Sequence, residues 1–171
     1  DFVAAGIRHT VLAGVDYQHN KYDRVSTYGG NFPINPYNPV YGATVGEFDP
    51  YYDGKTLLQQ TGTYLQEQAR YDGWVVTLGG RYDWSDLHAT DKVSGNPPDQ
   101  HDEAFTWRGG VLYRTESGLA PYYSYSTSFF PTAGHDDVTD KPFVPETGVQ
   151  HEVGIKYEIS GIKSLFTLAA F

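Results

Sequence analysis

The sequence lacks cysteine and methionine, and it has no long apolar run. Without cysteine there is no disulfide and no thiol chemistry. No run of about 18 apolar residues occurs, so a membrane-spanning helix is excluded, whereas membrane-spanning strands are signalled by alternation and stay allowed. Because the 171 residues contain no initiator Met and no signal peptide, we expect them to be a piece of a longer protein.

Positive charge is also scarce, since 12 Lys and Arg face 21 Asp and Glu, for a net charge of -9. Segments 21–56, 85–103 and 129–147 contain 13 acids and 5 bases, and so carry nearly the whole imbalance. Such a surface repels the phosphates of nucleic acids, which we exclude as partners. It either attracts cations or is a set of solvated loops.

Aromatic residues and glycine are abundant, with 15 Tyr, 9 Phe, 3 Trp and 19 Gly, which favours strands joined by turns. The stretch 74–84 is the clearest example. Successive strand residues point to opposite faces. One face is apolar with aromatic ends, and the other is mostly polar or small: Trp74, Val76, Leu78, Gly80, Tyr82 and Trp84 against Val75, Thr77, Gly79, Arg81 and Asp83.

The same alternation recurs along the chain, with Glu67 as an exception on a less polar face. It predicts strands at 10–20, 57–71, 74–84, 105–114, 119–128, 149–157 and 164–171, the last without an assigned face. Short turns at 72–73, 116–118 and 160–161 alternate with the three long polar segments. This alternation of short and long connections is typical of outer-membrane barrels. A structureless segment as long as 21–56 argues against a compact soluble domain.

We therefore predict an all-β fold, an antiparallel transmembrane β-barrel fragment with long external loops and short periplasmic turns. About seven strands cannot close a useful pore, and open strand edges in lipid leave backbone groups unpaired at several kcal/mol each. The chain is thus expected to be one part of a larger barrel.

Several motifs, in order, resemble TonB-dependent siderophore receptors of the ferrichrome type. They lie at His9–Tyr17, Tyr37–Gly42, Gln60–Gln68, Leu78–Trp84, Phe105–Gly110, Ala120–Ser126 and Gln150–Tyr157. The resemblance implies that 1–171 is the middle of one barrel domain of about 22 strands. The family's plug domain and C-terminal barrel strands are not in this sequence.

The resemblance further implies a receptor in the bacterial outer membrane that binds a ferric siderophore, hydroxamate-like or ferrichrome-like, and imports it by TonB-dependent active transport. Expected partners are the siderophore, TonB acting through the plug, and outer-membrane lipid and lipopolysaccharide. Iron enters only as the preassembled chelate, so no cofactor and no metal ligand of the protein is expected.

Siderophore pockets of the family are lined by aromatics, which supply rigid area with a polar tip. The candidate ligand-binding residues are Tyr28, Phe32, Tyr37, Tyr41, Phe129 and Phe130. Tyr28 is the first choice. The alternatives are that Tyr37 and Tyr41 pack the loop on itself, and that Phe129 and Phe130 anchor a loop or belong to the girdle.

Charged residues on the polar row are expected to face the lumen: Arg81, Asp83, Arg108, Arg114, Glu152 and Lys156. They either contact the plug or pair across neighbouring strands, which we favour. The expected membrane girdle is Trp74, Tyr82, Trp84, Trp107, Tyr113 and Tyr157.

Other functions remain as alternatives. They are a TonB-dependent receptor for another ligand, a passive porin or barrel enzyme, and a soluble carbohydrate-binding β-sandwich. We expect no enzyme, because no nucleophile–base pair is found. The sequences His101-Asp102-Glu103 and His135-Asp136-Asp137 lack the spacing of a zinc site and are better explained as solvated loops.

Overall fold

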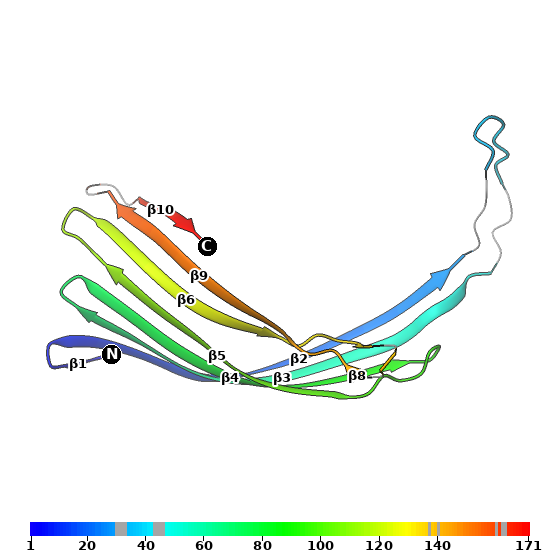
Figure 1. Cartoon of the computed structure of the whole chain (residues 1–171), viewed down its shortest axis with the longest axis horizontal. Helices are drawn as coiled ribbons and strands as arrows, with labels where there is room; N and C mark the ends of the chain where they lie inside the picture. Colours follow the sequence, from blue (N-terminus) through cyan, green and yellow to red (C-terminus); the bar gives the residue numbers. More distant parts are fainter. Residues whose placement is uncertain (30–33, 43–46, 137, 140, 160, 162–163) are drawn as a thin grey trace.

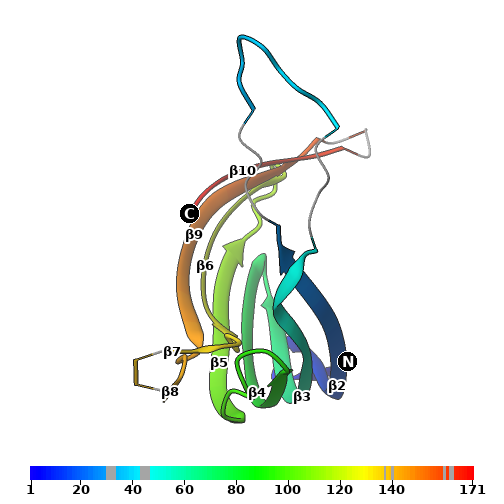
Figure 2. The same cartoon turned by 90° about the vertical axis from the view of Figure 1, so that its right-hand side faces the viewer.

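The computed structural model describes the chain except residues 30–33, 43–46, 137, 140, 160 and 162–163. One antiparallel sheet of eight strands dominates, in the order β1-β2-β3-β4-β5-β6-β9-β10. It curves like the wall of an open trough (Figures 1 and 2). Its strands are β1 (Phe2–Ala4), β2 (Ile7–Tyr28), β3 (Asp49–Tyr71), β4 (Trp74–Asp91), β5 (Gln100–Tyr113), β6 (Leu119–Phe130), β9 (Glu146–Glu158) and β10 (Leu165–Ala170), and a separate hairpin pairs β7 (His135–Asp136) with β8 (Lys141–Pro142).

The described residues contain no helix of the length and apolar character needed to cross a membrane. All seven predicted strands are present, and each pairs antiparallel with its neighbours. The all-β prediction is thereby confirmed.

The predicted boundaries of the long segments were wrong. Strands β2, β3, β4 and β5 continue well into 21–56 and 85–103, which leaves 29–48 and 92–99 as connections. These extensions are paired from Lys21↔Leu57 to Tyr28↔Asp49, with one register shift between Ser26 and Thr27, and from Ser85↔Asp102 to Leu87↔Gln100. Cross-strand pairing therefore overrides their polar composition. The alternation also missed the short strands β1, β7 and β8.

The turn between β3 and β4 is the predicted Asp72-Gly73 hairpin. Both residues have positive φ, 42° at Asp72 and 83° at Gly73. Two positive φ values match the twist of the flanking strands, and Asp-Gly tolerates them well. The turns that follow β1, β3 and β5 lie at one end of the sheet, whereas the connections that follow β2, β4 and β6 begin at the other end (Figure 1).

The two faces of the sheet differ sharply in exposure. Leu78 and Val153, on the apolar row, are 60% and 59% exposed, whereas Asp83 and Leu87, on the other row, are 3% and 5% exposed. Side chains converge on the concave side of a curved sheet, so the buried row marks the inner face and the apolar row marks the outer face. The sheet register also assigns β10: Phe166 and Leu168 are paired with outer-face residues Tyr157 and Ile155.

Nothing in the described structure covers the outer face. Among the described residues, Leu87 and Ala120 are the buried apolar ones. Exposure of a large apolar side chain at this level costs about 1 kcal/mol in water. A dozen such residues would cancel a typical folding free energy of about 5–15 kcal/mol. This bare face contradicts the soluble-sandwich alternative. The outer-face residues concerned are Val11, Val15, Leu65, Val76, Leu78, Phe105, Val111, Val149, Val153, Ile155, Phe166 and Leu168.

Glu67 does lie on the outer face, as its place in the pattern indicated, opposite Val11 and Leu78. Its Oε1 is 2.6 Å from His9 Nδ1, and the His9 ring stacks on Phe2 with centroids 4.9 Å apart. The carboxylate thus has a partner on the neighbouring strand.

Glycines on the inner face provide room for large neighbours. Gly62 of β3 lies between Asp16 and Asp83 in the register, and the Arg81 side chain crosses directly over it. A Cβ at Gly62 would overlap the Arg81 guanidinium. At Gly79 the same added atom would meet Arg108 and Gln66 at 3.5 Å, which is ordinary contact.

Asp91 holds together the ends of β3 and β4 at the long-loop end of the sheet. Its Oδ1 accepts the N–H groups of Val93 at 3.0 Å and Asp53 at 3.3 Å, and its Oδ2 accepts the Ser94 hydroxyl. The Ser94 hydrogen bond, followed by that of Val93, lowers the pKa of Asp91. Lys92 adds an ion pair to Asp53 at 2.8 Å.

Gly62→Ala should destabilise the full-length receptor by about 1–3 kcal/mol, because Arg81 must leave a charged hydrogen bond. Gly79→Ala is the matched control and should stay within about 0.5 kcal/mol of the parent. The measurement is thermal unfolding followed by the gel shift of the folded barrel. Equal effects of the two substitutions, or an undiminished Gly62→Ala effect in an Asp16→Asn background, would contradict this packing.

Asp91→Asn should loosen the tip 92–99, seen as faster hydrogen exchange at the amides of Val93 and Asp53. Since the folded pKa lies below the ordinary 3.8, the carboxylate stabilises the tip above that value, and this is lost as pH falls through the folded pKa. After correction for intrinsic exchange, the parent should lose protection below about pH 4 and the Asn variant should not. Asp86→Asn, at an exposed position, should behave like the parent.

Candidate functional site

The inner face carries a charged cluster around Arg81. Its Nη1 and Nη2 donate to the two oxygens of Asp16 at 2.5 and 2.9 Å, and its Nε donates to Asp83 Oδ2 at 2.8 Å. Gln60 donates to Asp83 at 2.9 Å. One guanidinium therefore neutralises carboxylates on β2 and β4 by passing over the intervening strand β3.

Arg81 and Asp83 were predicted to face the lumen, whereas the partner Asp16 was missed. Asp16 stands two strands away from Asp83, and an alternation pattern within single strands does not show which strands a long side chain can cross. The signal that could have found it is Gly62, the residue without a side chain between them.

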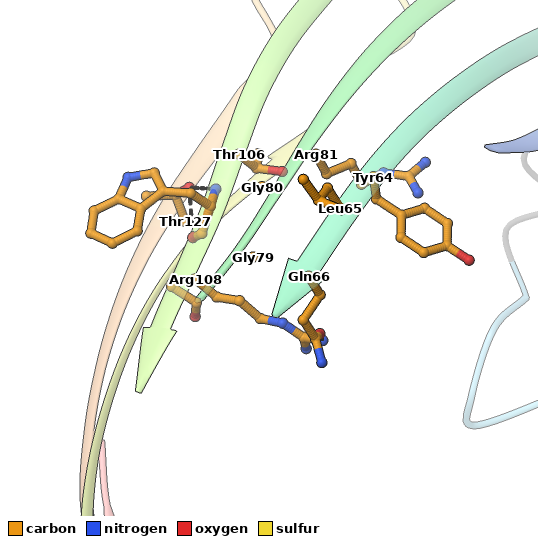
Figure 3. A pocket seen from close by; sticks show the side chains of 11 residues that line it. Tyr64, Leu65, Gln66, Gly79, Gly80, Arg81, Thr106, Arg108 and Thr127 are labelled. Atoms are coloured by element: carbon orange, nitrogen blue, oxygen red, sulfur yellow. Dashed lines mark hydrogen bonds between the residues drawn. The ribbon is translucent and has the colours of Figure 1, made fainter. Parts of the chain in front are cut away.

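A second arginine crosses the sheet nearer the short-turn end. Arg108 of β5 extends past Gly79 and donates to Gln66 of β3, as Figure 3 shows. Thr127 lies beside it and accepts the Trp107 N–H at 2.9 Å. The backbone pairing of β5 with β6 begins at Arg108↔Ser126, so the two strands diverge toward the long-loop end. A hollow of about 460 Å³ lies here between β3, β4, β5 and β6.

The remaining predicted lumen residues lie on β9 and at the end of β5. Glu152 accepts the hydroxyl of Tyr122 rather than an arginine, and Lys156 stands 5.1 Å from the centroid of the Tyr122 ring. Arg114 pairs with Glu158 at 2.6 Å at the short-turn end. Cross-strand partners within the chain thus exist for most of the six residues, and whether a plug also contacts them stays a prediction.

Residues 34–42 of the first long connection lie away from the sheet (Figures 1 and 2). Tyr28 ends β2 and is 64% exposed, while Tyr37 and Tyr41 are 96% and 80% exposed. Neither Tyr37 nor Tyr41 therefore packs against the described part of the loop. Phe32 lies outside the described residues.

Phe129 and Phe130 close β6 at the same end, opposite Thr147 and Glu146 of β9. In the sheet order, β6 is separated from β2 by three strands. The structure therefore does not bring these phenylalanines together with Tyr28. It places both groups at the long-loop end, where Tyr28 and Phe130 are each 64% exposed and Phe129 is half-buried.

The third long connection contributes residues that the sequence pattern did not indicate. Gln100, 3% exposed, donates to the Phe143 carbonyl at 3.0 Å, which ties the segment after β8 to β5. The buried Ser85 hydroxyl and Gln100 Oε1 have no hydrogen-bond partner among the described residues. Gln100 was read as loop, because its burial depends on a segment distant in sequence.

The predicted girdle residues lie on the outer face. Trp74 of β4 and Tyr113 of β5 have ring centroids 4.7 Å apart near the short turns, and Tyr82 and Trp84 are 4.8 Å apart farther along β4. Trp107 contacts Tyr125 at 4.7 Å, and Tyr157 lies near the end of β9. The aromatic contacts thus join neighbouring strands at Trp74–Tyr113 and Trp107–Tyr125, and lie within one strand at Tyr82–Trp84.

The first of the two histidine-containing sequences, predicted as a loop, lies within β5, and the second begins in β7. His101 lies 2.5 Å from Asp86, which raises the pKa of His101. Asp136 accepts the N–H groups of Thr139 at 2.9 Å and Val138 at 2.8 Å, and these bonds lower the pKa of Asp136. Within the described ranges, no group of three or more His, Cys, Asp or Glu is placed to hold a metal ion.

Known proteins give a consistent comparison. The chain is 40% identical over 165 residues to the ferrioxamine B receptor of Salmonella typhimurium, covering 96% of the chain and 23% of that receptor. It is 42% identical over 168 residues to the ferrichrome outer membrane transporter/phage receptor of Escherichia coli, covering 91% of the chain and 22% of that protein. The chain therefore spans about a quarter of the length of these relatives.

Solved structures share the fold at lower identity. The unliganded ferric citrate transporter FecA superposes with a TM-score of 0.71 at 17% identity, over 94% of this chain and 23% of that one. The ferric preacinetobactin receptor BauA of Acinetobacter baumannii gives 0.70 at 20% identity, over 98% of this chain and 26% of that one. The family model of the TonB dependent receptor-like β-barrel matches residues 1–171. The chain belongs to this family of TonB-dependent receptor β-barrels.

Proposed function

We propose that this chain is the wall and outer-loop region of a bacterial outer-membrane receptor that binds a ferric siderophore and imports it by TonB-dependent transport. The observation that carries the proposal is the bare apolar outer face joined to long connections at one end only. Hydrocarbon is the environment in which such a face is stable, and long loops mark the external side of outer-membrane barrels.

A hydroxamate-type chelate is the proposed ligand. Support comes from relatives named as ferrioxamine B and ferrichrome receptors at 40% and 42% identity. The chelate already saturates its iron, so the protein needs flat amphipathic groups to cover it rather than metal ligands. Exposed tyrosines at the long-loop end supply such groups.

Within the proposed receptor, the residues that contact the chelate from the outward side are Tyr28, Phe32, Tyr37, Tyr41, Phe129 and Phe130. The lumen charges hold the wall and face the plug, through which TonB acts. The girdle tryptophans and tyrosines lie at the two levels where lipid and lipopolysaccharide headgroups begin. The iron arrives and leaves as a chelate.

Tyr28→Ala in the full-length receptor should weaken binding of ferric ferrioxamine B or ferrichrome about tenfold, the equivalent of about 1.4 kcal/mol. The physical reason is the loss of a rigid aromatic contact from the end of β2. Tyr71→Ala, at the opposite end of the sheet, is the matched control and should leave the Kd unchanged. Equal Kd values for Tyr28→Ala and the parent would show that Tyr28 does not contact the chelate.

A deletion of the whole gene should abolish growth on ferric hydroxamates as the sole iron source and leave growth on ferric citrate unchanged. The readout is uptake of the radioactive iron chelate, with and without collapse of the proton gradient. If the deletion abolishes uptake of a different chelate and leaves uptake of ferric hydroxamates unchanged, the receptor has another ligand. Uptake that persists without the gradient would indicate a passive pore.

A further inference from the structure

Strands β2 and β3 continue past the end of β4 and form a two-stranded ribbon at the long-loop end. β4 pairs with β3 as far as Gly54, whereas β2 and β3 stay paired as far as Tyr28. Figure 1 shows this ribbon projecting beyond β4 and β5. Arg24 of β2 is the register partner of Gly54, and it follows the inner-face residue Asp16 by an even number of positions. Because strand residues alternate between faces, Arg24 lies on the inner row, above the lumen.

Two neighbours hold the side chain of Arg24. Its Nε donates to the Ser26 hydroxyl at 2.8 Å, and its Cζ lies 5.6 Å from the centroid of the Tyr52 ring. The Tyr52 ring in turn lies across Gly54, where an added Cβ would come within 2.7 Å of the Tyr52 hydroxyl. A guanidinium within about 6 Å of an aromatic centroid is attracted by the ring. In the described part of the chain, the two Nη groups of Arg24 have no hydrogen-bond partner and stay free to donate.

The charge of Arg24 is not neutralised. Among the residues that the structure describes, no carboxylate forms an ion pair with it. The nearest acids along the ribbon lie on the outer row and have cations of their own. Asp23 is 3.7 Å from Lys21, and Asp53 is 2.8 Å from Lys92. A guanidinium that is held in place without a counter-charge is available to an acceptor that approaches from outside the chain.

Two exposed tyrosines share the inner row of β2 with Arg24. Tyr22 precedes it by two positions and Tyr28 follows it by four, and they are 62% and 64% exposed. Four positions along an extended strand span about 13 Å. Since tyrosine and arginine side chains are both long, one bound chelate that contacts Tyr28 can also contact Arg24. The ribbon thus presents rigid aromatic area with a single cation inside it.

We propose that Arg24 is a specificity-determining residue of the ligand-binding region and selects ferric chelates by their charge. Its free Nη groups donate to a carboxylate or carbonyl oxygen at the periphery of the chelate, and its charge disfavours an ammonium group at the same point. A hydrogen bond between a guanidinium and a carboxylate is about twice as strong as one between neutral groups. Tyr52 is a positioning residue that keeps the guanidinium in place. This inference rests on the proposed function, because it assigns a charge preference to the ligand of that function.

The acid-rich segments near the ribbon do not cancel this preference. They attract cations at long range, but salt screens charges that are separated by more than about 8 Å at physiological ionic strength. Arg24 acts at hydrogen-bond distance, where screening is weak. The two effects therefore separate: the loops influence the rate of encounter, and Arg24 influences the equilibrium between bound chelates of different charge.

The direct test uses one chelate in three charge states. They are ferric ferrioxamine B, which ends in an ammonium group, its N-acetyl derivative, which is neutral there, and its N-succinyl derivative, which ends in a carboxylate. The Kd of each is measured for the full-length receptor and for the Arg24→Gln variant. The substitution should weaken binding of the succinyl form about tenfold and of the acetyl form less, because a charge-assisted hydrogen bond is lost. The ammonium form should not be weakened.

Matched variants separate charge selection from support of the ribbon. Lys21→Gln removes a positive charge from the same strand on the outer face, and it should change all three Kd values by the same factor. Tyr52→Leu should act in the same direction as Arg24→Gln but less strongly, whereas Tyr52→Phe keeps the ring and should behave like the parent. The gel shift of the folded barrel confirms that each variant is assembled.

Two results would overturn the proposal. One is an equal change in Kd for the three chelates in Arg24→Gln, which would show that Arg24 only supports the ribbon. The other is three Kd values that match those of the parent. Failure of the parent to bind any of the three chelates would instead refute the proposed function, and this inference with it.

Discussion

The structure depends on one constraint: a single sheet presents an apolar face that no other part of the described chain covers. In water, that face would cost as much free energy as a domain of this size gains by folding. In hydrocarbon the same face costs little, but every backbone group there must be paired, so the sheet has to continue until it closes. The hydrocarbon environment of the outer face and the closure of the sheet thus follow from the same side chains, among them Val76, Leu78 and Val153.

The inner face is concave, and it has to accommodate charged and aromatic side chains in a small space. Arg81 lies over Gly62, and Tyr64 lies over Gly14, so each large residue uses the space that a glycine leaves on the next strand. The charges are then divided by level. Arg81 is neutralised within the wall, whereas Arg8 and Arg70 nearer the short turns are not. Ion pairs within the wall therefore neutralise arginine at one level of the inner face and not at the next.

Much of this architecture could be predicted from the sequence because its determinants are local. Alternation in 74–84 located a strand and its outer face, and Asp72-Gly73 located a turn. What could not be predicted depends on partners distant in sequence. Strand β4 runs on to Asp91 because β3 and β5 pair with it, Gln100 is buried by the segment around Phe143, and Asp16 meets Arg81 across a strand. The outer-loop tyrosines were predicted through a family resemblance, and their role as ligand contacts stays a prediction, because the structure does not bring Tyr28 together with Phe129 and Phe130.

The most direct test of the account is a comparison of neighbouring residues on one strand. Spin labels at Val76 and Leu78, and at Thr77 and Gly79, would be examined in the full-length receptor in a lipid bilayer. The account predicts that labels at 76 and 78 collide with oxygen dissolved in the hydrocarbon and are shielded from a water-soluble nickel complex, and that labels at 77 and 79 are shielded from the dissolved oxygen. Equal accessibility of all four labels to the nickel complex, or shielding of 76 and 78 from both reagents, would contradict a lipid-facing outer surface.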